Sequence, residues 1–352
     1  MGGSDSIRVR VPGKAILAGE YAVLAGGPAI VCAVGRHLSL EARPSERLVL
    51  EGVGSRWEEG EPETPELGFA RTAVRAAARY LEGRGVRVEG QSLAFGDALR
   101  APGGQKLGLG GSACTSVAAV AATLASVQAE PARELIFKLA AIAHGAAQGK
   151  PGSAVDVAAS TWGGTLWTRQ FEVEPFLALL EGPAQAFAYL VDRVPAPEVE
   201  RLPEPPGFTL VFSGTSASTP KLVGEVERFR RGSPAGFAEF MARTCEASDR
   251  LRRALSAGQL EGATRALADA GRLLEGLGER AGVAIVTEEH RRIAERAAGH
   301  GAAAKISGAG GGDCSVAIGG AEAIGRLRRE LEAAGLVVLA PGVDGGGVVI
   351  ER

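Results

Sequence analysis

The alternation of apolar and polar positions predicts strands and helices in the first half of the chain. Residues 7–14 have the pattern of a strand that runs into a turn, and residues 28–43 form a longer apolar strand. Residues 67–80 have helical spacing and many alanines. Two further helices are expected at 112–127, after a glycine-rich turn, and at 134–144.

The second half repeats this mixture with longer helices. Residues 208–218 predict a strand and a turn, residues 224–300 are mostly helical, and residues 305–319 place a glycine loop beside a strand. Two more strands are expected within 335–352. Strands separated by helices in both halves predict a mixed α/β or α+β architecture.

A proline-dense segment at 194–206 is the best candidate for a domain boundary. Proline cannot continue a helix or a central strand, so this segment is expected to be a linker. A chain of 352 residues also exceeds the usual size of one hydrophobic core. We therefore expect an N-terminal domain of residues 1–200 and a C-terminal domain of residues 201–352.

Composition and charge favour a globular protein over a nucleic-acid-binding or membrane-spanning one. Hydrophobic residues make up 45% and charged residues 23%, which is typical of a globular protein. A formal net charge of -2 with both signs interspersed provides no basic face, so we expect no nucleic-acid partner. No stretch approaches the roughly 20 apolar residues of a membrane span, and no signal core is evident, so we expect a cytoplasmic protein without a membrane partner. The four cysteines have no metal-binding or disulfide spacing.

A glycine-rich loop at 103–113 is the first candidate ligand site. It ends where an alanine-rich helix begins, so unpaired N–H groups and the positive end of the helix dipole face a ligand together, which suits phosphate groups. Ser112 at the helix start can cap the helix or offer its hydroxyl to a magnesium ion. The loop is neither a Walker A loop nor a Rossmann fingerprint, so a structural connection stays open as an alternative.

A second glycine loop and an opening motif add two candidate segments. Residues 305–314 contain four glycines between apolar strand residues, and such glycines are costly in unfolded-state entropy. A ligand-facing backbone would justify that cost, whereas a flexible hairpin turn is the alternative. Residues 12–23 follow a strand and carry Lys14, which by itself reads as a solvated loop lysine.

Two polar segments are candidates for holding an anionic substrate. Within 148–159, Asp156 stands among apolar residues at a loop-to-helix junction, where it is either a capping residue or a functional carboxylate. Residues 212–223 gather hydroxyl groups and a lysine, which suit an anion. A serine- and threonine-rich helix start with a cap is the alternative for that segment.

These segments together resemble the motifs of the GHMP kinases, the superfamily named for galactokinase, homoserine kinase, mevalonate kinase and phosphomevalonate kinase. The motifs are PGKAILAGEY at 12–21, GLGGSA at 108–113, QGKPGSAVDVAA at 148–159, FSGTSASTPKLV at 212–223 and KISGAGGGDC at 305–314. They follow the family's order, span nearly the whole chain and are most similar to the phosphomevalonate kinase branch. Gly111 departs from the pattern by replacing the first serine of the phosphate loop, and Ala154 stands where glycine is usual.

The resemblance implies a fold and a set of residue roles. The implied fold is α+β, with an N-terminal domain like the second domain of ribosomal protein S5 and a C-terminal ferredoxin-like domain. Lys14 and Asp156 are the implied catalytic residues, and Ser112 is the magnesium-associated one. The implied ATP-binding residues are Lys106, Gly108, Leu109, Gly110, Gly111, Ser112, Ala113, Gly310 and Gly311. The implied substrate-binding residues are Lys14, Tyr21, Lys150, Ser153, Asp156, Ser213, Ser218, Thr219, Ala309 and Gly310.

The implied reaction is phosphorylation of 5-phosphomevalonate to 5-diphosphomevalonate, in the mevalonate pathway of isoprenoid biosynthesis, with ATP and Mg²⁺ as cofactors. The partner is thus a small molecule. A phosphate monoester has a second pKa of about 6, so the acceptor oxygen is already ionised at neutral pH and needs no strong base. We expect Lys14 to neutralise charge between donor and acceptor, while Asp156 orients Lys14, or Lys14 and the acceptor together, rather than removing a proton.

Several alternatives stay open at this point. A mevalonate kinase or another GHMP kinase would share the nucleotide loops, and a diphosphomevalonate decarboxylase would also release carbon dioxide. A ligand-sensing regulator of the same fold would bind ATP without turnover. The stretch before Lys150 contains no acid that would serve as a second magnesium ligand, and we interpret His144 there as a structural histidine. The oligomeric state is not predicted.

Overall fold

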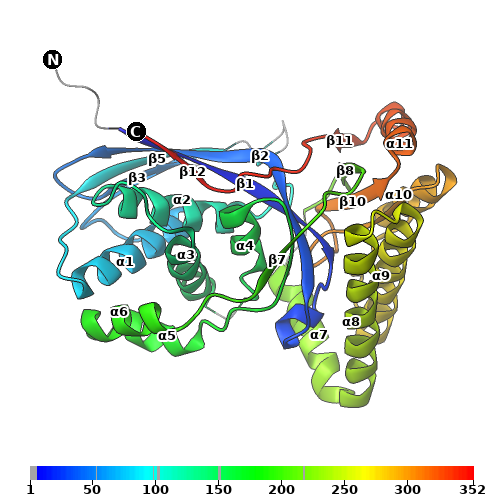
Figure 1. The fold of residues 1–352 in the computed structure, drawn as a ribbon, viewed down its shortest axis with the longest axis horizontal. Coiled ribbons are helices and arrows are strands. Elements are labelled where there is room, and N and C mark those ends of the chain that lie inside the picture. The colour runs from blue at the N-terminus through cyan, green and yellow to red at the C-terminus, as the bar shows by residue number, and fades with distance from the viewer. Residues whose placement is uncertain (1–5, 53, 98, 101–103, 150–151, 217–218) are drawn as a thin grey trace.

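The computed structural model has two sheets, each packed against its own helices (Figure 1). It describes residues 6–52, 54–97, 99–100, 104–149, 152–216 and 219–352. Among the described residues, no helix is both long enough and apolar enough to cross a lipid bilayer.

The first sheet contains eight strands within the described part of the chain, in the order β12-β1-β2-β5-β3-β4, with β6 joining β2 to β7. The strands are β1 (Ile7–Ala18), β2 (Ala29–Pro44), β3 (Val49–Gly52), β4 (Ser55–Glu58), β5 (Gln91–Asp97), β6 (Thr165–Thr168), β7 (Val199–Leu202) and β12 (Val349–Glu351). The helices gather below this sheet in Figure 1. They are α1 (Gly68–Gly83), α2 (Gly111–Ala125), α3 (Arg133–Gln148), α4 (Val155–Trp162), α5 (Glu174–Leu180) and α6 (Ala184–Arg193), with short 3-10 turns η1 (Ala22–Ala25) and η2 (Pro65–Leu67).

The second sheet has the antiparallel order β11-β8-β10-β9. Its strands are β8 (Gly207–Phe212), β9 (Ala303–Ile306), β10 (Cys314–Gly319) and β11 (Val337–Leu339). The helices of this half are α7 (Thr219–Gly232), α8 (Pro234–Ser256), α9 (Leu260–Ala281), α10 (Glu288–Gly299) and α11 (Ala321–Ala333). Numbered along the chain, the strands lie in the order 4-1-3-2 with helices between strands 1 and 2 and between strands 3 and 4, which is the ferredoxin-like arrangement.

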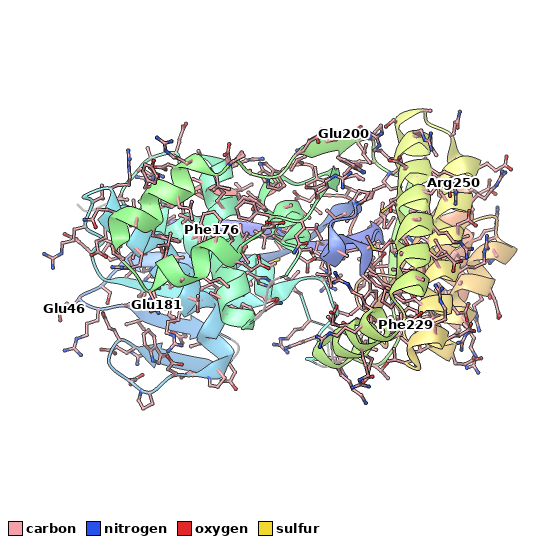
Figure 2. All side chains as sticks on the ribbon, turned by 90° about the horizontal axis from the view of Figure 1, so that it is seen from below. Glu46, Phe176, Glu181, Glu200, Phe229 and Arg250 are labelled. Atoms are coloured by element: carbon pink, nitrogen blue, oxygen red, sulfur yellow. The ribbon has the colours of Figure 1, made fainter. Side chains whose placement is uncertain are left out.

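Helix α2 and strand β1, which carry two of the predicted motifs, are held in place by burial in the first domain. Helix α2 is apolar and small on all sides and is buried along almost its whole length, so it lies inside the first domain rather than on its surface. Both α2 and α4 pack against β1. Figure 2 shows Phe176, which is fully buried, within the helical layer of the first domain, and Phe229 in the helical part of the second.

Two local expectations are corrected by the strand pairing. The turn expected at the end of 7–14 does not form, because β1 continues past Pro12 and Gly13 to Ala18 and absorbs the proline at a register shift against β2. The expected linker 194–206 contains β7, which pairs with β6 while the prolines lie outside the strand.

The predicted division of the chain at residues 200 and 201 stays a prediction. The pairing shows that β7, which crosses this point, belongs to the first sheet and that β12 returns to it to pair with β1. An ion pair of 2.7 Å between Arg252 on α8 and Glu200 on β7 also joins the two halves, and Figure 2 places Glu200 above the region between them.

Helix α10 begins with a capping box that contains a buried histidine. The Thr287 side chain accepts from the His290 backbone N–H, and the His290 side chain accepts from the Thr287 backbone N–H. His290 is 1% exposed, and burial lowers the pKa of its imidazole to about 4, although the nearby carbonyls of Asp313 and Gly312 act in the opposite direction. The neutral imidazole is therefore part of the folded structure beside the second glycine loop.

We predict that His290 makes the folded state sensitive to acid. Because the pKa is lowered in the folded state, its contribution to stability is present above about pH 6.5, the ordinary histidine value, and is lost as the pH falls towards 4. Glutamine at the same position keeps the capping box and does not titrate. Urea unfolding at pH 7 and pH 4.5 should show that wild type loses roughly 2 to 3 kcal/mol more than His290→Gln. Equal losses would contradict the prediction.

Candidate active site

Lys14 lies at the centre of the site, between the two glycine loops. Its side chain is 6% exposed, and Nζ donates to the Gly108 carbonyl at 3.2 Å and lies 3.5 Å from the Asp156 carboxylate. Its backbone N–H donates to the Leu109 carbonyl at 2.9 Å, which fastens β1 to the first glycine loop. A Cβ added to Gly308 of the second loop would lie 3.8 Å from Nζ, so this loop also borders the amine.

The first glycine loop adopts the conformation that its glycines permit. Gly108 and Gly110 have φ of 73° and 79°, in the left-handed region, and Gly110 is the N-cap of α2. A Cβ at Gly110 would come within 2.9 Å of the Lys14 side chain, whereas a Cβ at Gly111 meets nothing within 4 Å. The predicted residue Leu109 has a buried side chain, so only its backbone can meet a ligand.

The other predicted nucleotide residues of this loop differ in exposure. Lys106 is exposed, and Ala113 is fully buried in the first turn of α2. Ser112 is half-buried, and its Oγ lies 3.0 Å from Nε2 of His144. Burial and, to a smaller extent, Lys14 lower the pKa of His144, while the charge of Asp156 acts in the opposite direction.

The second glycine loop is tied to the opening motif by polar contacts. The Tyr21 hydroxyl donates to the Ala309 carbonyl at 2.6 Å, and burial, with the Glu20 charge adding to it, raises the pKa of this phenol. The Ser307 hydroxyl accepts from the Ile16 backbone N–H at 2.8 Å. Tyr21 and Ala309, both predicted as substrate-binding residues, are thus brought together.

Gly310 and Gly311 are held by the segment before α10. The Gly311 N–H donates to the Ile285 carbonyl at 2.7 Å, and a Cβ on Gly310 would collide with the same carbonyl at 2.2 Å. The Gly311 N–H is therefore already engaged, and its part in ATP binding stays a prediction.

The 213–216 segment reaches both glycine loops. Ser213 donates its backbone N–H to the Asp313 carbonyl at 2.9 Å, and Asp313 donates in turn to the Thr215 carbonyl at 2.7 Å. The Ser216 hydroxyl donates to the Lys106 carbonyl at 3.1 Å. Ser213 is 8% exposed. The 213–216 segment, part of the stretch predicted to bind an anionic substrate, thus adjoins the first glycine loop.

Three further predicted substrate residues are described only in part or not at all. Lys150 and Ser218 lie outside the described residues, and the structure places the backbone of Thr219 at the start of α7. Ser153 is half-buried and stands two residues before α4, whose first turn carries Asp156. Ala154, between Ser153 and α4, is the N-cap of that helix and has a left-handed backbone conformation with φ of 60°.

The sequence interpretation did not single out the buried pair Lys305 and Glu20. Their side chains are 0% and 2% exposed and form a salt bridge, and Lys305 also donates to the carbonyls of Ile16 and Ile306. Burial lowers the pKa of Lys305, and the Glu20 charge opposes that shift. Both residues lie within recognised motifs, and the available signal was Lys305, a charged residue between the apolar strand positions Ala304 and Ile306.

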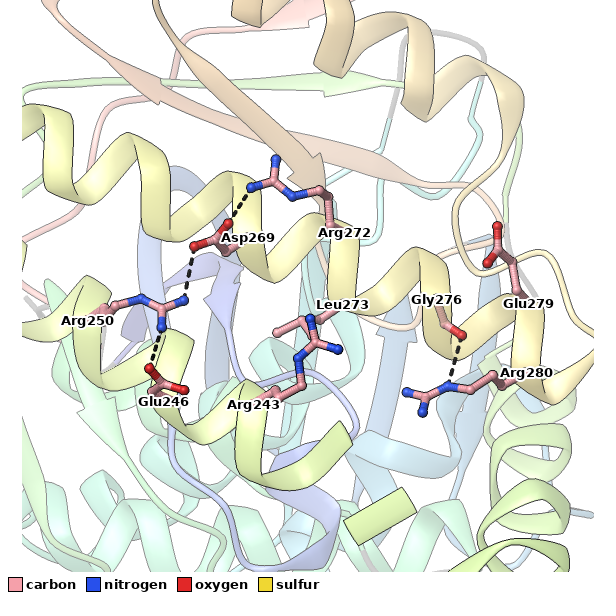
Figure 3. A pocket seen from close by; sticks show the side chains of 9 residues that line it. All are labelled: Arg243, Glu246, Arg250, Asp269, Arg272, Leu273, Gly276, Glu279 and Arg280. Atoms are coloured by element: carbon pink, nitrogen blue, oxygen red, sulfur yellow. Dashed lines mark hydrogen bonds and ion pairs between the residues drawn. The ribbon is translucent and has the colours of Figure 1, made fainter. Parts of the chain in front are cut away.

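A hollow of about 470 Å³ lies between α8 and α9, and none of its lining residues belongs to the glycine loops (Figure 3). Its arginines are engaged by carboxylates: Arg250 pairs with Glu246 at 2.7 Å and with Asp269 at 3.0 Å, and Arg272 pairs with the same aspartate. These pairs satisfy the charges, so the hollow provides no free cationic site. The convergence around Lys14 is the better candidate.

The chain is similar to known protein families and proteins over most of its length. Models of the GHMP kinases N terminal domain and the GHMP kinases C terminal match residues 70–164 and 229–337. Phosphomevalonate kinase of Streptomyces sp. (strain CL190) is 32% identical, covering 97% of this chain and 99% of that protein.

Solved structures have the same fold. The Lin0012 protein from Listeria innocua has a TM-score of 0.90 and 30% identity, covering 99% of this chain and 100% of its own. Streptococcus pneumoniae phosphomevalonate kinase, in complex with phosphomevalonate and AMPPNP, has a TM-score of 0.83 and 24% identity over 98% and 99% of the two chains. The predicted two-domain fold is confirmed, and the chain, a homologue of phosphomevalonate kinase, belongs to the GHMP kinase family.

Proposed function

We propose that this protein transfers the γ-phosphoryl group of ATP to the phosphate of 5-phosphomevalonate, giving ADP and 5-diphosphomevalonate. The observation that carries the proposal is the position of Lys14, which is buried between both glycine loops and beside Asp156. The full-length similarity to the Streptomyces phosphomevalonate kinase favours this acceptor within the family.

The residues of the site fit a reaction that depends on alignment and charge neutralisation. The P–O bond to ADP breaks while an oxygen of the acceptor phosphate bonds to the γ-phosphorus. Lys14 supplies positive charge between the two phosphate groups, and Asp156 with the Gly108 carbonyl holds its amine in place. The acceptor oxygen is already ionised at neutral pH, so Asp156 orients rather than removes a proton.

The donor set is compatible with magnesium bound mainly through nucleotide phosphates. No group of three or more His, Cys, Asp or Glu side chains that could hold a metal gathers within the described ranges. Ser112 offers a hydroxyl oxygen at the phosphate-facing end of α2, and Mg²⁺ typically combines few protein oxygens with phosphate and water. When bound, the ion would neutralise charge on the phosphates.

Product analysis with a panel of acceptors tests the proposed reaction. The purified protein is given ATP·Mg²⁺ with mevalonate, 5-phosphomevalonate or 5-diphosphomevalonate, while ADP and carbon dioxide are followed. Turnover confined to 5-phosphomevalonate, without carbon dioxide, is the expected result. Turnover on mevalonate, or release of carbon dioxide from 5-diphosphomevalonate, would show that the proposed acceptor is wrong. ATP binding without turnover on a broader panel of acceptors would favour a ligand sensor.

Replacing Asp156 with asparagine should impair turnover more than nucleotide binding. The substitution keeps the shape of the side chain but removes the charge that holds Lys14, and a small misplacement of a catalytic group can cost roughly 100-fold in kcat. The KM for ATP should change by less than about threefold, because the proposed role of Asp156 is to orient Lys14, while the glycine loops hold the nucleotide. Unchanged kcat in Asp156→Asn would exclude this role.

A matched control for Asp156→Asn exists on α3. Glu134 pairs with the buried Lys138 at 3.0 Å, so it is also a partly exposed carboxylate beside a buried lysine. Because Lys138 of this pair also donates to the carbonyls of Val191 and Val194 and not to a glycine loop, Glu134→Gln should leave kcat unchanged. Equal losses in both variants would indicate a general effect of removing an ion pair.

The adjacent glycines of the phosphate loop should respond differently to serine. Gly110→Ser forces a side chain into a left-handed conformation, at a cost of roughly 1–2 kcal/mol, and into contact with Lys14. Its kcat/KM for ATP should fall by at least about tenfold. Gly111→Ser enters open space in the helical first turn and should keep kcat/KM within about threefold. Steady-state kinetics and thermal melts of both variants check this, and similar losses in both would contradict it.

A further inference from the structure

The hydroxyl of Ser112 has a buried partner on another helix. His144, on α3, is 8% exposed, and its Nε2 lies 3.0 Å from the Ser112 Oγ at the start of α2. The imidazole stacks on Phe69 of α1 with 5.2 Å between ring centroids. The ring is therefore fixed by packing on one side and bonded to the serine through its edge.

The Ser112 hydroxyl has no backbone carbonyl of its own helix four residues earlier to which it could donate. Hydroxyls within a helix commonly donate to the carbonyl four residues earlier. Thr115 and Thr123 of α2 do so, at 2.9 Å and 2.8 Å. For Ser112 that carbonyl belongs to Gly108, which precedes the helix and already accepts from Lys14. The bond that fixes the Ser112 rotamer is instead supplied from α3.

We propose that His144 is a positioning residue that holds the Ser112 hydroxyl in the orientation used towards the nucleotide phosphates and their magnesium ion. This inference rests on the proposed function, in which Ser112 faces the ATP phosphates. A half-buried serine at a helix end that lacks such a bond samples several rotamers, and ordering one of them only on binding would cost conformational entropy. His144 removes that cost before the nucleotide arrives. It touches neither substrate nor reacting atoms.

Nucleotide binding with and without magnesium separates positioning from packing. A fluorescent ADP analogue is titrated into the full chain with excess Mg²⁺ or excess EDTA. The variants are Ser112→Ala, His144→Phe, the double variant and His144→Gln. Phenylalanine keeps a ring against Phe69 but cannot bond to serine, whereas the glutamine amide reaches about as far as Nε2 and can bond.

Ser112→Ala and His144→Phe should each weaken binding of the Mg²⁺ complex by about tenfold. This is the effect expected when one hydrogen bond, and the serine rotamer that it fixes, are lost. The double variant should be no weaker than Ser112→Ala, because both changes remove the same interaction. His144→Gln should recover most of the affinity. In EDTA all variants should lie within about twofold of wild type.

Additive losses of affinity in the double variant would overturn the inference. It would also be overturned if His144→Phe lost as much affinity in EDTA as with Mg²⁺, or if His144→Phe bound the Mg²⁺ complex as tightly as wild type. If His144→Phe does not fold, His144→Gln decides: near wild-type metal-dependent affinity supports positioning, and a loss equal to that of Ser112→Ala overturns it. Wild-type protein that binds no nucleotide would overturn the proposed function and this inference together. Nucleotide binding with turnover on a different acceptor would change only the proposed substrate.

Discussion

The structure depends on one buried ion pair between its two sheets. Lys305 on β9 and Glu20 after β1 are almost fully removed from water, and Lys305 also donates to the carbonyl of Ile16. Removing one partner of such a pair leaves an uncompensated buried charge, which typically costs 3–5 kcal/mol. The pair therefore fixes the strand that carries Lys14 relative to the strand that leads into the second glycine loop. The bonds from Ser307 to Ile16 and from Tyr21 to Ala309 join the same two segments, so the two glycine loops are held on either side of Lys14.

Backbone strain concentrates around the same centre. Among the described residues, the non-glycine positions with positive φ are Tyr21, Ala154 and Asp313. They lie in the opening motif at 12–23, in the segment 148–159 that carries Asp156 and in the second glycine loop at 305–314. A left-handed conformation at a residue with a Cβ is held only where surrounding contacts determine it, as the Tyr21 hydroxyl bond to Ala309 does. Strain at three separate segments that meet is typical of a preorganised site.

Much of this arrangement could be predicted from the sequence, because local chemistry determines it. The glycine loop before α2 follows from residue type, and the resemblance to GHMP kinases identified Lys14 and Asp156, which the structure brings to 3.5 Å. The strand through Pro12 and the strand β7 could not be predicted, because pairing with β2 and β6 overrides local turn signals. The contact of His144 with Ser112 joins separate helices, and a single sequence contains no information on that distance.

Because β12 pairs with β1, the first sheet is completed by a strand that is synthesised after the second domain. β1 appears early, and its free edge is paired by β12 only after the whole second domain has been synthesised. During that interval the edge is open to pairing with another nascent chain. Arg8 and Arg10 are exposed along this edge, and their charges oppose such pairing until Glu351 and its neighbours arrive. The two arginines thus place positive charge along an edge whose partner strand follows the whole second domain in the sequence.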